Sequence, residues 1–275
     1  MKKLRLINIS LALLILAGCT TNPVTGRKEF TGAVSTDEEL KLGITSFDQM
    51  KKEVPISRDA KANATVQRVG KQIAGVAGKD MPNAQWEFVV FDSKEANAFC
   101  LPGGKVGVYT GILPITRDDA GLATVLGHEI GHAVSRHGAE RMASSQVLQV
   151  GGALLGAATQ NAKPITQTVV STAYGLGGQL GYELPHSRGQ ESEADHVGLI
   201  YMARAGYDPH AAVEFWQRFS DYNAKNGGDK TPNLLRTHPV DAVRIKQLQD
   251  WMPDAMQQYS GRGAAASPGS QVIGR

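Results

Sequence analysis

A short motif with two histidines constrains this chain more than any other feature: it contains His128, Glu129 and, one helical turn later, His132. Residues four apart on a helix have Cβ atoms roughly 5–6 Å apart on one face, so both imidazoles can reach a single metal ion. Glu129 projects beside that ion, where its carboxylate can take a proton from water. A core helix with two incidental histidines is the alternative, and evidence against it must come from the rest of the chain.

The N-terminal segment, residues 1–18, has the features of a bacterial targeting peptide. Three basic residues precede an apolar stretch at residues 6–16, which is too short to span a membrane. The segment ends in Leu-Ala-Gly before Cys19, a pattern that resembles the lipobox of bacterial lipoproteins, whose cysteine carries the lipid. With Thr20 after the cysteine, the resemblance implies a lipid anchor in the cell envelope, at the outer membrane and facing the periplasm. An ordinary signal peptide with a chance cysteine is the alternative.

The charge balance changes when that segment is removed. The full chain has 29 lysines and arginines against 26 aspartates and glutamates. Residues 1–18 hold three of the basic residues and no acidic ones, so 29 minus 3 leaves 26 against 26. We therefore expect no nucleic-acid partner and no charge-driven attraction to a membrane. If Cys19 carries lipid, Cys100 has no intramolecular partner and is predicted to be a small buried apolar side chain.

The rest of the chain is long enough for one domain with its own core, which we place at residues 35–260. Residues 19–34 are polar and contain Gly and Pro, so they are expected to form a tether or an arm lying on the domain. The tail, residues 261–275, is rich in Gly, Ala and Ser and is expected to be flexible. Patterns within the domain predict a mostly helical α+β fold, with a small β-sheet packed on the helix of the two histidines.

The first half of the domain is predicted to supply two helices and the sheet. Capping signals and helical periodicity indicate helices at about 35–52 and 60–77. Aromatic and β-branched residues indicate a strand at 86–91, followed by a hairpin with strands at 96–101 and 105–109.

The first strand of this hairpin has a possible second role. If Asn97, Ala98 and Phe99 lie at a sheet edge, their free backbone groups can bind an extended substrate peptide as an added strand. A plain structural hairpin is the alternative. A cap and first-turn carboxylates at residues 116–119 then start the helix that carries His128.

The second half of the domain is predicted to be helical. Residues 146–181 are rich in Gly, Ala and Leu and are expected to form one or two packed helices with a break near Pro164. A membrane-facing role for this segment is the alternative. A capping box at residues 187–190 is expected to open a further helix that ends near Gly206.

The C-terminal part contains two more predicted helices. One begins at Asp208 and Pro209, and residues 223–232 form a polar loop after it. The last helix follows the sequence Thr-His-Pro around His238. The residues expected to face inward from that helix are Val243, Ile245 and Leu248.

A catalytic zinc ion usually has three protein ligands, so a third must come from a later segment. His137 is excluded by helix geometry, because it lies about 140° around the helix from His132 and should point away. Glu191 and Asp195 lie four apart on one helix face, so one carboxylate can bind the metal while the other braces a histidine. The alternative is that both belong to a solvated helix N-terminus.

Several short motifs follow one another along the chain. They are Asn97-Ala98-Phe99, Pro102-Gly103-Gly104, Leu126-Gly127-His128-Glu129-Ile130-Gly131-His132, Ser187-Arg188 with Glu191-x-x-Ala194-Asp195, and Thr237-His238-Pro239 with Arg244-Ile245. In this order they resemble the HtpX and CAAX-prenyl-endopeptidase (Ste24-like) family of zinc metallopeptidases, of the gluzincin type. The resemblance covers about residues 22–250 and points to a bacterial lipoprotein branch related to the mitochondrial Oma-type stress protease.

The resemblance implies a zincin-like metallopeptidase fold that binds one zinc ion per chain. By position, His128, His132 and Glu191 match the zinc ligands of the family. Glu129 matches its general base, so the implied reaction is hydrolysis of a peptide bond by activated water.

Further residues acquire expected roles from the same resemblance. Asp195 matches an acidic residue that supports the site, and Arg244 is expected to pair with a carboxylate there. His238 matches a family histidine that faces the metal, and its expected role is to donate a hydrogen bond to the oxyanion. Glu193 falls at a variable position of the motif and is not assigned to the metal.

The expected activity is that of an endopeptidase acting on periplasmic or outer-membrane proteins, misfolded ones above all. Processing of prenylated proteins is not expected, because the chain lacks the spanning helices of the membrane-embedded relatives. A chaperone or assembly factor that keeps the zinc fold but rarely cuts is the rival reading, with His238 in the open zinc position and an envelope assembly machinery as its partner. An aminopeptidase would need a site for a free amine, and no G-x-M-E-N-like segment occurs.

Overall fold

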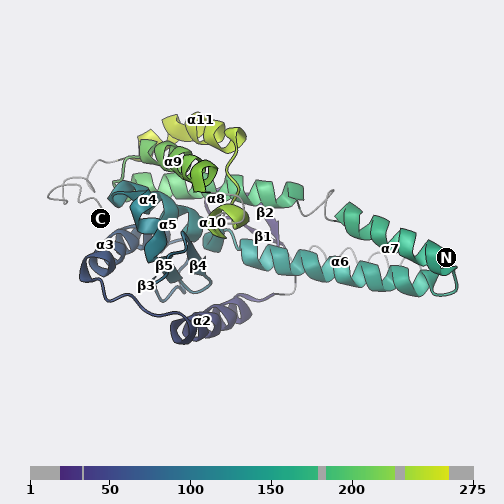
Figure 1. Ribbon diagram of the computed structural model, residues 1–275. Helices are drawn as coiled ribbons and strands as arrows, with labels where there is room; N and C mark the ends of the chain where they lie inside the picture. The colour runs from purple at the N-terminus through teal and green to yellow at the C-terminus, as the bar shows by residue number, and fades with distance from the viewer. Residues whose placement is uncertain (1–18, 33, 179–183, 227–232, 260–275) are drawn as a thin grey trace.

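The computed structural model describes residues 19–32, 34–178, 184–226 and 233–259 (Figure 1). The predicted targeting segment and the predicted tail from residue 261 lie outside the described residues. The elements, in chain order, are β1 (Cys19–Thr21), β2 (Lys28–Phe30), α2 (Thr36–Glu53), α3 (Ala60–Ala77), β3 (Glu87–Phe91), β4 (Ala98–Leu101), β5 (Lys105–Tyr109), the 3-10 turn η1 (Thr110–Ile112), α4 (Leu113–Thr116), α5 (Asp119–Val134), α6 (His137–Thr159), α7 (Pro164–Gly178), α8 (Leu184–Arg204), α9 (His210–Asn226), α10 (Asn233–Thr237) and α11 (Ala242–Gln258).

The main sheet has three strands in the order β3-β5-β4. β3 runs parallel to β5, and β4 pairs with β5 in antiparallel fashion, so the predicted hairpin is confirmed and β4 lies at the sheet edge. Side chains alternate between the two faces of a strand. Val106 and Val108 therefore join the main core, which contains α5, while Phe99 and Tyr109 pack on the other face against Phe47 of α2.

α5 is the central helix of the domain and is buried along almost its whole length. It begins as predicted, because the Asp118 side chain accepts a hydrogen bond from the backbone N–H of Gly121 at 2.9 Å. α3, β4, α8 and α9 all pack against it. The mostly helical α+β fold with a small sheet on this helix is thus confirmed.

Glycines allow α5 and α8 to approach until their backbones touch. A Cβ added at Gly127 would lie 2.9 Å from the carbonyl oxygen of Gly198, and one at Gly131 would lie 2.8 Å from that of Ala194. Real Cβ atoms almost never come so close, so only glycine fits at these two positions of α5. The contact sets the inward face of α5 directly opposite Glu191 on α8.

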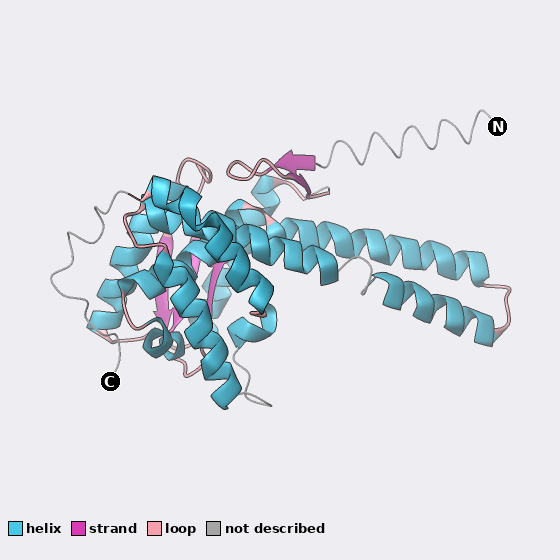
Figure 2. Cartoon of the chain, turned by 90° about the horizontal axis from the view of Figure 1, so that it is seen from above, coloured by secondary structure: helices cyan, strands magenta, loops and turns pink. Residues whose placement is uncertain are grey.

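α6 and α7 form a helical hairpin that projects away from the domain, as two views show (Figures 1 and 2). The two helices pack on each other, and the break between them falls next to Pro164 as predicted. No side chain of α7 is buried. Large apolar residues of the hairpin are exposed: Val147, Val150, Leu154, Ile165, Val169 and Leu176. Among the described helices, none combines the length and the apolar composition that crossing a bilayer requires.

The N-terminal arm, residues 19–32, lies on the domain as a two-stranded hairpin of β1 and β2. The buried Asn22 side chain donates a hydrogen bond to Ser135 Oγ at 2.7 Å, between α5 and α6. Strand β2 packs against α6. The arm is therefore attached to the domain at the point where the metal-site helix ends.

Two predicted boundaries were wrong. α8 begins at Leu184, one turn before the predicted capping box at 187–190, because Pro185 in a first turn is compatible with a helix start and Ser187 is tolerated inside a helix. α9 continues to Asn226, so part of the predicted loop at 223–232 is helical, and residues 227–232 lie outside the described part of the chain.

The predicted inward face of α11 was wrong at one position. Val243 is 63% exposed, whereas Arg244 and Leu248 are buried and Ile245 is partly buried. An apolar pattern misses this face because one of its buried positions holds an arginine. That arginine contacts the metal-site carboxylates of Asp195 and Glu191.

Candidate metal centre

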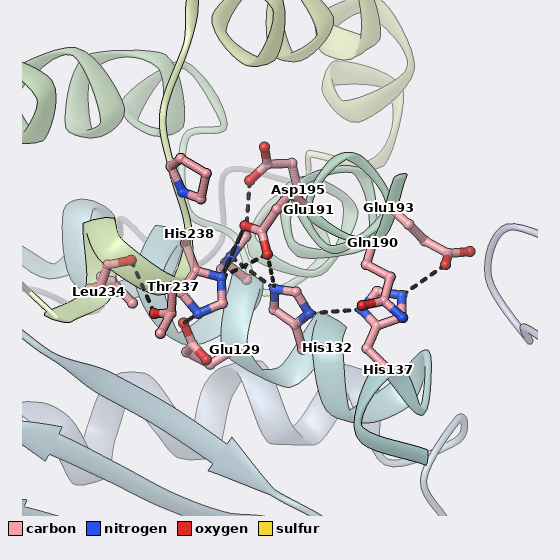
Figure 3. Close-up of polar contacts among 12 residues, drawn as sticks. Glu129, His132, His137, Gln190, Glu191, Glu193, Asp195, Leu234, Thr237 and His238 are labelled. Carbon is pink, nitrogen blue, oxygen red and sulfur yellow. Dashed lines mark hydrogen bonds and ion pairs between the residues drawn. The ribbon is translucent and has the colours of Figure 1, made fainter. Parts of the chain in front are cut away.

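The two histidines of α5 point their Nε2 atoms at each other, 3.1 Å apart. Glu191 of α8 places one carboxylate oxygen 3.4 Å from Nε2 of His128 and the other 3.3 Å from Nε2 of His132. His238, which follows α10, directs Nδ1 at the same group and lies 2.9 Å from Glu191 Oε1. One ligand atom from each of these four residues lies within 4.8 Å of the other three. Figure 3 shows Glu191 and His238 facing His132.

His128 is held from behind by a buried ion pair. Its Nδ1 lies 2.9 Å from Asp195 Oδ1. The Arg244 guanidinium donates to both oxygens of the same carboxylate, at 2.7 and 2.8 Å, and stacks 4.5 Å over the ring of Trp216. Because a carboxylate only accepts hydrogen bonds, neutral His128 carries its proton on Nδ1 and turns the lone pair of Nε2 toward the cluster.

His132 is held from behind by a second imidazole. Its Nδ1 lies 2.7 Å from Nδ1 of His137, and Nε2 of His137 lies 3.0 Å from Glu193 Oε2 (Figure 3). Burial lowers the pKa of both histidines, so both are neutral. His137 donates from Nε2 to the carboxylate and accepts at Nδ1, which requires His132 to donate from Nδ1. The lone pair of His132 Nε2 is therefore also directed into the cluster.

A metal cation fits this donor set. When both histidines are neutral, their two Nε2 lone pairs lie 3.1 Å apart with a carboxylate beside them, and they repel one another unless a cation, either a proton or a metal ion, lies between them. Imidazole nitrogens and a carboxylate oxygen are ligands that zinc accepts, and three protein ligands are typical of a catalytic site. His128, His132 and Glu191 can therefore hold a metal ion, with His238 at a further position.

The pKa values of the ligand side chains affect how the site binds a metal ion. Burial raises the pKa of Glu191, but hydrogen bonds from His128, His132 and His238 outweigh burial and hold it well below its usual range. Burial lowers the pKa of His128, but hydrogen bonds to Asp195 and Glu191 raise it to about 9. At neutral pH a metal ion must therefore displace a proton from His128, which makes metal affinity pH-dependent.

Glu129 lies beside the cluster, with His238 as a neighbour. Only 4% of its surface is exposed, and its Oε1 accepts no hydrogen bond from the described residues. Its Oε1 lies 3.7 Å from Nε2 of His238. Burial raises the pKa of the carboxyl, which brings it toward neutrality, where a general base works best. A buried carboxylate beside the metal ligands, with one oxygen that accepts no hydrogen bond from the described residues, is suited to take a proton from water.

Comparison with known protein families shows what this arrangement is. Residues 60–252 match the sequence profile of peptidase family M48. The chain belongs to peptidase family M48. The matched part contains the four residues of the cluster as well as Glu129. The prediction of a metal-dependent peptidase with a His-Glu-x-x-His site is therefore confirmed.

Relatives of the M48 chain come from mitochondria and bacteria. The mitochondrial metalloendopeptidase OMA1 of Schizosaccharomyces pombe is 34% identical over 236 residues, covering 85% of this chain and 66% of that protein. OMA1 of Saccharomyces cerevisiae is 32% identical, covering 86% and 70%. The beta-barrel assembly-enhancing protease of Yersinia pestis is 27% identical, covering 79% and 44%. The chain thus spans about two thirds of the yeast proteins and less than half of the bacterial one.

The predicted substrate-binding residues lie in and next to an edge strand of the main sheet. β4 is at the sheet edge and packs against the M48 metal-site helix α5. Ala98 is buried, and the Asn97 carbonyl accepts from the backbone N–H of Tyr109 at 3.0 Å. The Phe99 ring packs against Phe91 and Tyr109. The side chains of Ala98 and Phe99 pack within the domain, so binding of a peptide through the backbone of this edge stays a prediction.

Sequence reasoning missed the residues behind His132. The expectation that His137 points away was wrong, because it assumed one continuous helix. α5 ends at Val134, and Arg136 adopts a left-handed conformation with φ 45°, which turns His137 back toward His132. No glycine or proline marks this break, so the local sequence carries only a weak signal for it. The conclusion that His137 is not in the metal-ligand cluster agrees with the geometry.

Proposed function

We propose that this chain is a zinc-dependent endopeptidase that hydrolyses peptide bonds within polypeptide substrates of the bacterial cell envelope. The observation that carries the proposal is the buried Glu129 carboxylate beside the ligand cluster of an M48 site, with one oxygen that accepts no hydrogen bond from the described residues. Zinc is favoured over other metals because imidazole and carboxylate together form its common catalytic ligand set.

The residues of the site have separate roles in the proposed reaction. His128, His132 and Glu191 hold the zinc ion, which when bound acts as a Lewis acid that activates water and polarises the scissile carbonyl. Glu129 accepts the proton of the attacking water and delivers it to the leaving amine. His238 donates a hydrogen bond to the oxygen that becomes negative during the reaction, once it turns from Glu191 toward the substrate. The bond breaks without a covalent intermediate.

A second, latent state is supported by the position of His238. Its Nδ1 lies 3.3 Å from Nε2 of His128 and 2.9 Å from Glu191, among the ligand atoms. In that state His238 would serve as a fourth protein ligand of the metal in place of water. A chain that rests in this state binds clients as a chaperone or assembly factor and rarely cleaves them.

The cellular setting is inferred from the N-terminus and from one relative. The lipobox-like sequence before Cys19 supports a lipid anchor at the outer membrane, facing the periplasm. A relative is named a beta-barrel assembly-enhancing protease, which supports misfolded outer-membrane proteins as substrates and an assembly machinery as partner. Incorporation of labelled palmitate tests the anchor: wild type takes up the label and Cys19→Ser does not, and an unlabelled wild type refutes it.

Cleavage of denatured casein tests the activity. We expect zinc-loaded wild type to cleave it, and we expect cleavage to stop with a chelator and in Glu129→Gln, which keeps the metal ligands. Cleavage by Glu129→Gln at the wild-type rate would contradict the proposal. His238→Ala separates the two states in the same assay. Loss of an oxyanion donor slows cleavage by roughly 10²–10³-fold, whereas removal of a blocking ligand speeds it up.

A further inference from the structure

A chain of hydrogen bonds connects His132 to the N-terminal arm. It passes from His132 to His137 at 2.7 Å and from His137 to Glu193 at 3.0 Å. On its far side, Glu193 accepts from Nε of Arg27 at 2.6 Å and from the hydroxyl of Thr25. Arg27 and Thr25 belong to the arm. The Glu193 carboxylate is therefore hydrogen-bonded both to the arm and to His137, which is far from the arm in sequence.

This chain is shielded from water. His137 has no exposed surface, and Glu193 is 8% exposed. A buried carboxylate is costly unless charged or polar partners compensate it. The Glu193 carboxylate has such partners in His137, Thr25 and Arg27, all within hydrogen-bond distance. The partner that carries the compensating full charge is Arg27.

Arg27 is fixed by a second carboxylate. Its guanidinium donates to both oxygens of Glu140 in α6, at 2.8 and 2.9 Å. The arm is pinned close by, where Asn22 donates to Ser135 and to Glu29. Arg27 therefore has a defined position between α6 and α8, and it holds Glu193 in line with His137.

The direction of the hydrogen bonds shows what the chain does. Glu193 can only accept, so His137 donates from Nε2 and presents the lone pair of Nδ1. His132 must then donate from Nδ1, which leaves Nε2 free for the metal. A carboxylate that accepts a hydrogen bond behind a ligand histidine fixes its ring and raises its basicity. Here the carboxylate acts through an intervening imidazole.

We propose that the N-terminal arm is part of the metal centre, and that Arg27 and Glu193, acting through His137, position His132 and set the affinity for zinc. The inference rests on the proposed zinc site and adds to it a control by the segment that follows the lipobox. Arg27, Glu193 and His137 are positioning residues, because none of them contacts the substrate or the metal. Any displacement of the arm is expected to weaken the metal site.

Zinc binding by the full mature chain tests the proposal. The dissociation constant is measured by competition with a chelating indicator, in wild type and in Arg27→Ala and Glu193→Gln. Lys28→Ala is the matched control, because Lys28 is an exposed cation on the same arm. We expect both test variants to bind zinc roughly tenfold more weakly, at the lower end of the loss for an outer-shell partner, and we expect the control to bind as wild type does.

A spectrum separates positioning from mere loss of stability. Cobalt(II) is bound in place of zinc, and its visible absorption bands report the geometry of the ligands. Glu193→Gln, nearly the same size as the original residue, is expected to shift these bands, and Lys28→Ala is not. Wild-type affinity and an unchanged spectrum in Glu193→Gln would overturn the proposal, as would equal losses in Arg27→Ala and the control. If wild type binds zinc and cleaves no casein, the proposed function fails while this inference stands.

Discussion

The metal-site helix α5 and the hairpin of α6 and α7 both contain glycines, but these glycines have different neighbours. In α5, a Cβ at Gly127 or Gly131 would come within 3 Å of the carbonyl oxygens of Gly198 and Ala194 in α8. In α6, a Cβ at Gly156 would meet no atom within 4 Å. Glycines let two backbones touch in the first region, whereas the close neighbours of hairpin glycines such as Gly151 are side chains, here that of Tyr174.

The difference shows what the close contact is for. The metal ligands come from both α5 and α8, and they converge only because the backbones of these helices touch. The hairpin supplies no residue to the cluster. It exposes Leu154 to 67% and Val150 to 60%, whereas Leu126 of α5 is fully buried. Composition alone cannot tell these regions apart, because the neighbouring element decides the outcome.

Of two substitutions that test this difference between the regions, Gly198→Ala in α8 is expected to have the larger effect on stability and zinc binding. Its Cβ would lie 2.7 Å from the backbone nitrogen of His128 and 2.8 Å from the carbonyl carbon of Gly127. α8 must move outward and carry Glu191 with it. Overpacking of this kind costs typically about 1–3 kcal/mol. Urea unfolding of the metal-free protein should show that loss, and a zinc competition assay should show weaker binding. Unchanged values in both would mean that the helices do not need to touch.

Gly156→Ala is the matched change in the hairpin and is expected to have a smaller effect of opposite sign. The site is open and exposed, so alanine avoids the entropy cost of glycine, which is roughly 0.5–1 kcal/mol in a helix. Amide hydrogen exchange in α6 should slow by about twofold to fivefold, since local stability sets the exchange rate. Faster exchange, or any change in zinc affinity, would show that the hairpin and the metal site are not independent.

The sequence predicted the local features of the fold well. The cap at Asp118, the helix of His128, the hairpin of β4 and β5 and the break near Pro164 follow from periodicity and turn chemistry, which depend on neighbouring residues. The Glu191 and Asp195 pair was found because both lie on one helix face. These signals are short-range, so one sequence is sufficient to read them.

Long-range features were not predictable in the same way. The position of His137 depends on a left-handed turn at Arg136, a conformation that residues other than glycine rarely adopt. Asn22 and Thr31 of the N-terminal arm hydrogen-bond to Ser135 and Arg136 in this turn. The projection of the hairpin depends on what α6 does not contact. The buried Arg244 defeats a search for apolar faces because its charge is compensated by carboxylates from another helix.

The central claim is that contact between α5 and α8 assembles one zinc site from His128, His132 and Glu191, with Glu129 as the base. Equilibrium zinc binding in competition with a chelating indicator tests it most directly. Wild type and Glu129→Gln should each bind one ion with the same affinity. Glu191→Gln should bind more weakly by a larger factor than the roughly 10–100-fold that loss of an outer-shell partner costs. Wild-type affinity in Glu191→Gln would contradict the claim.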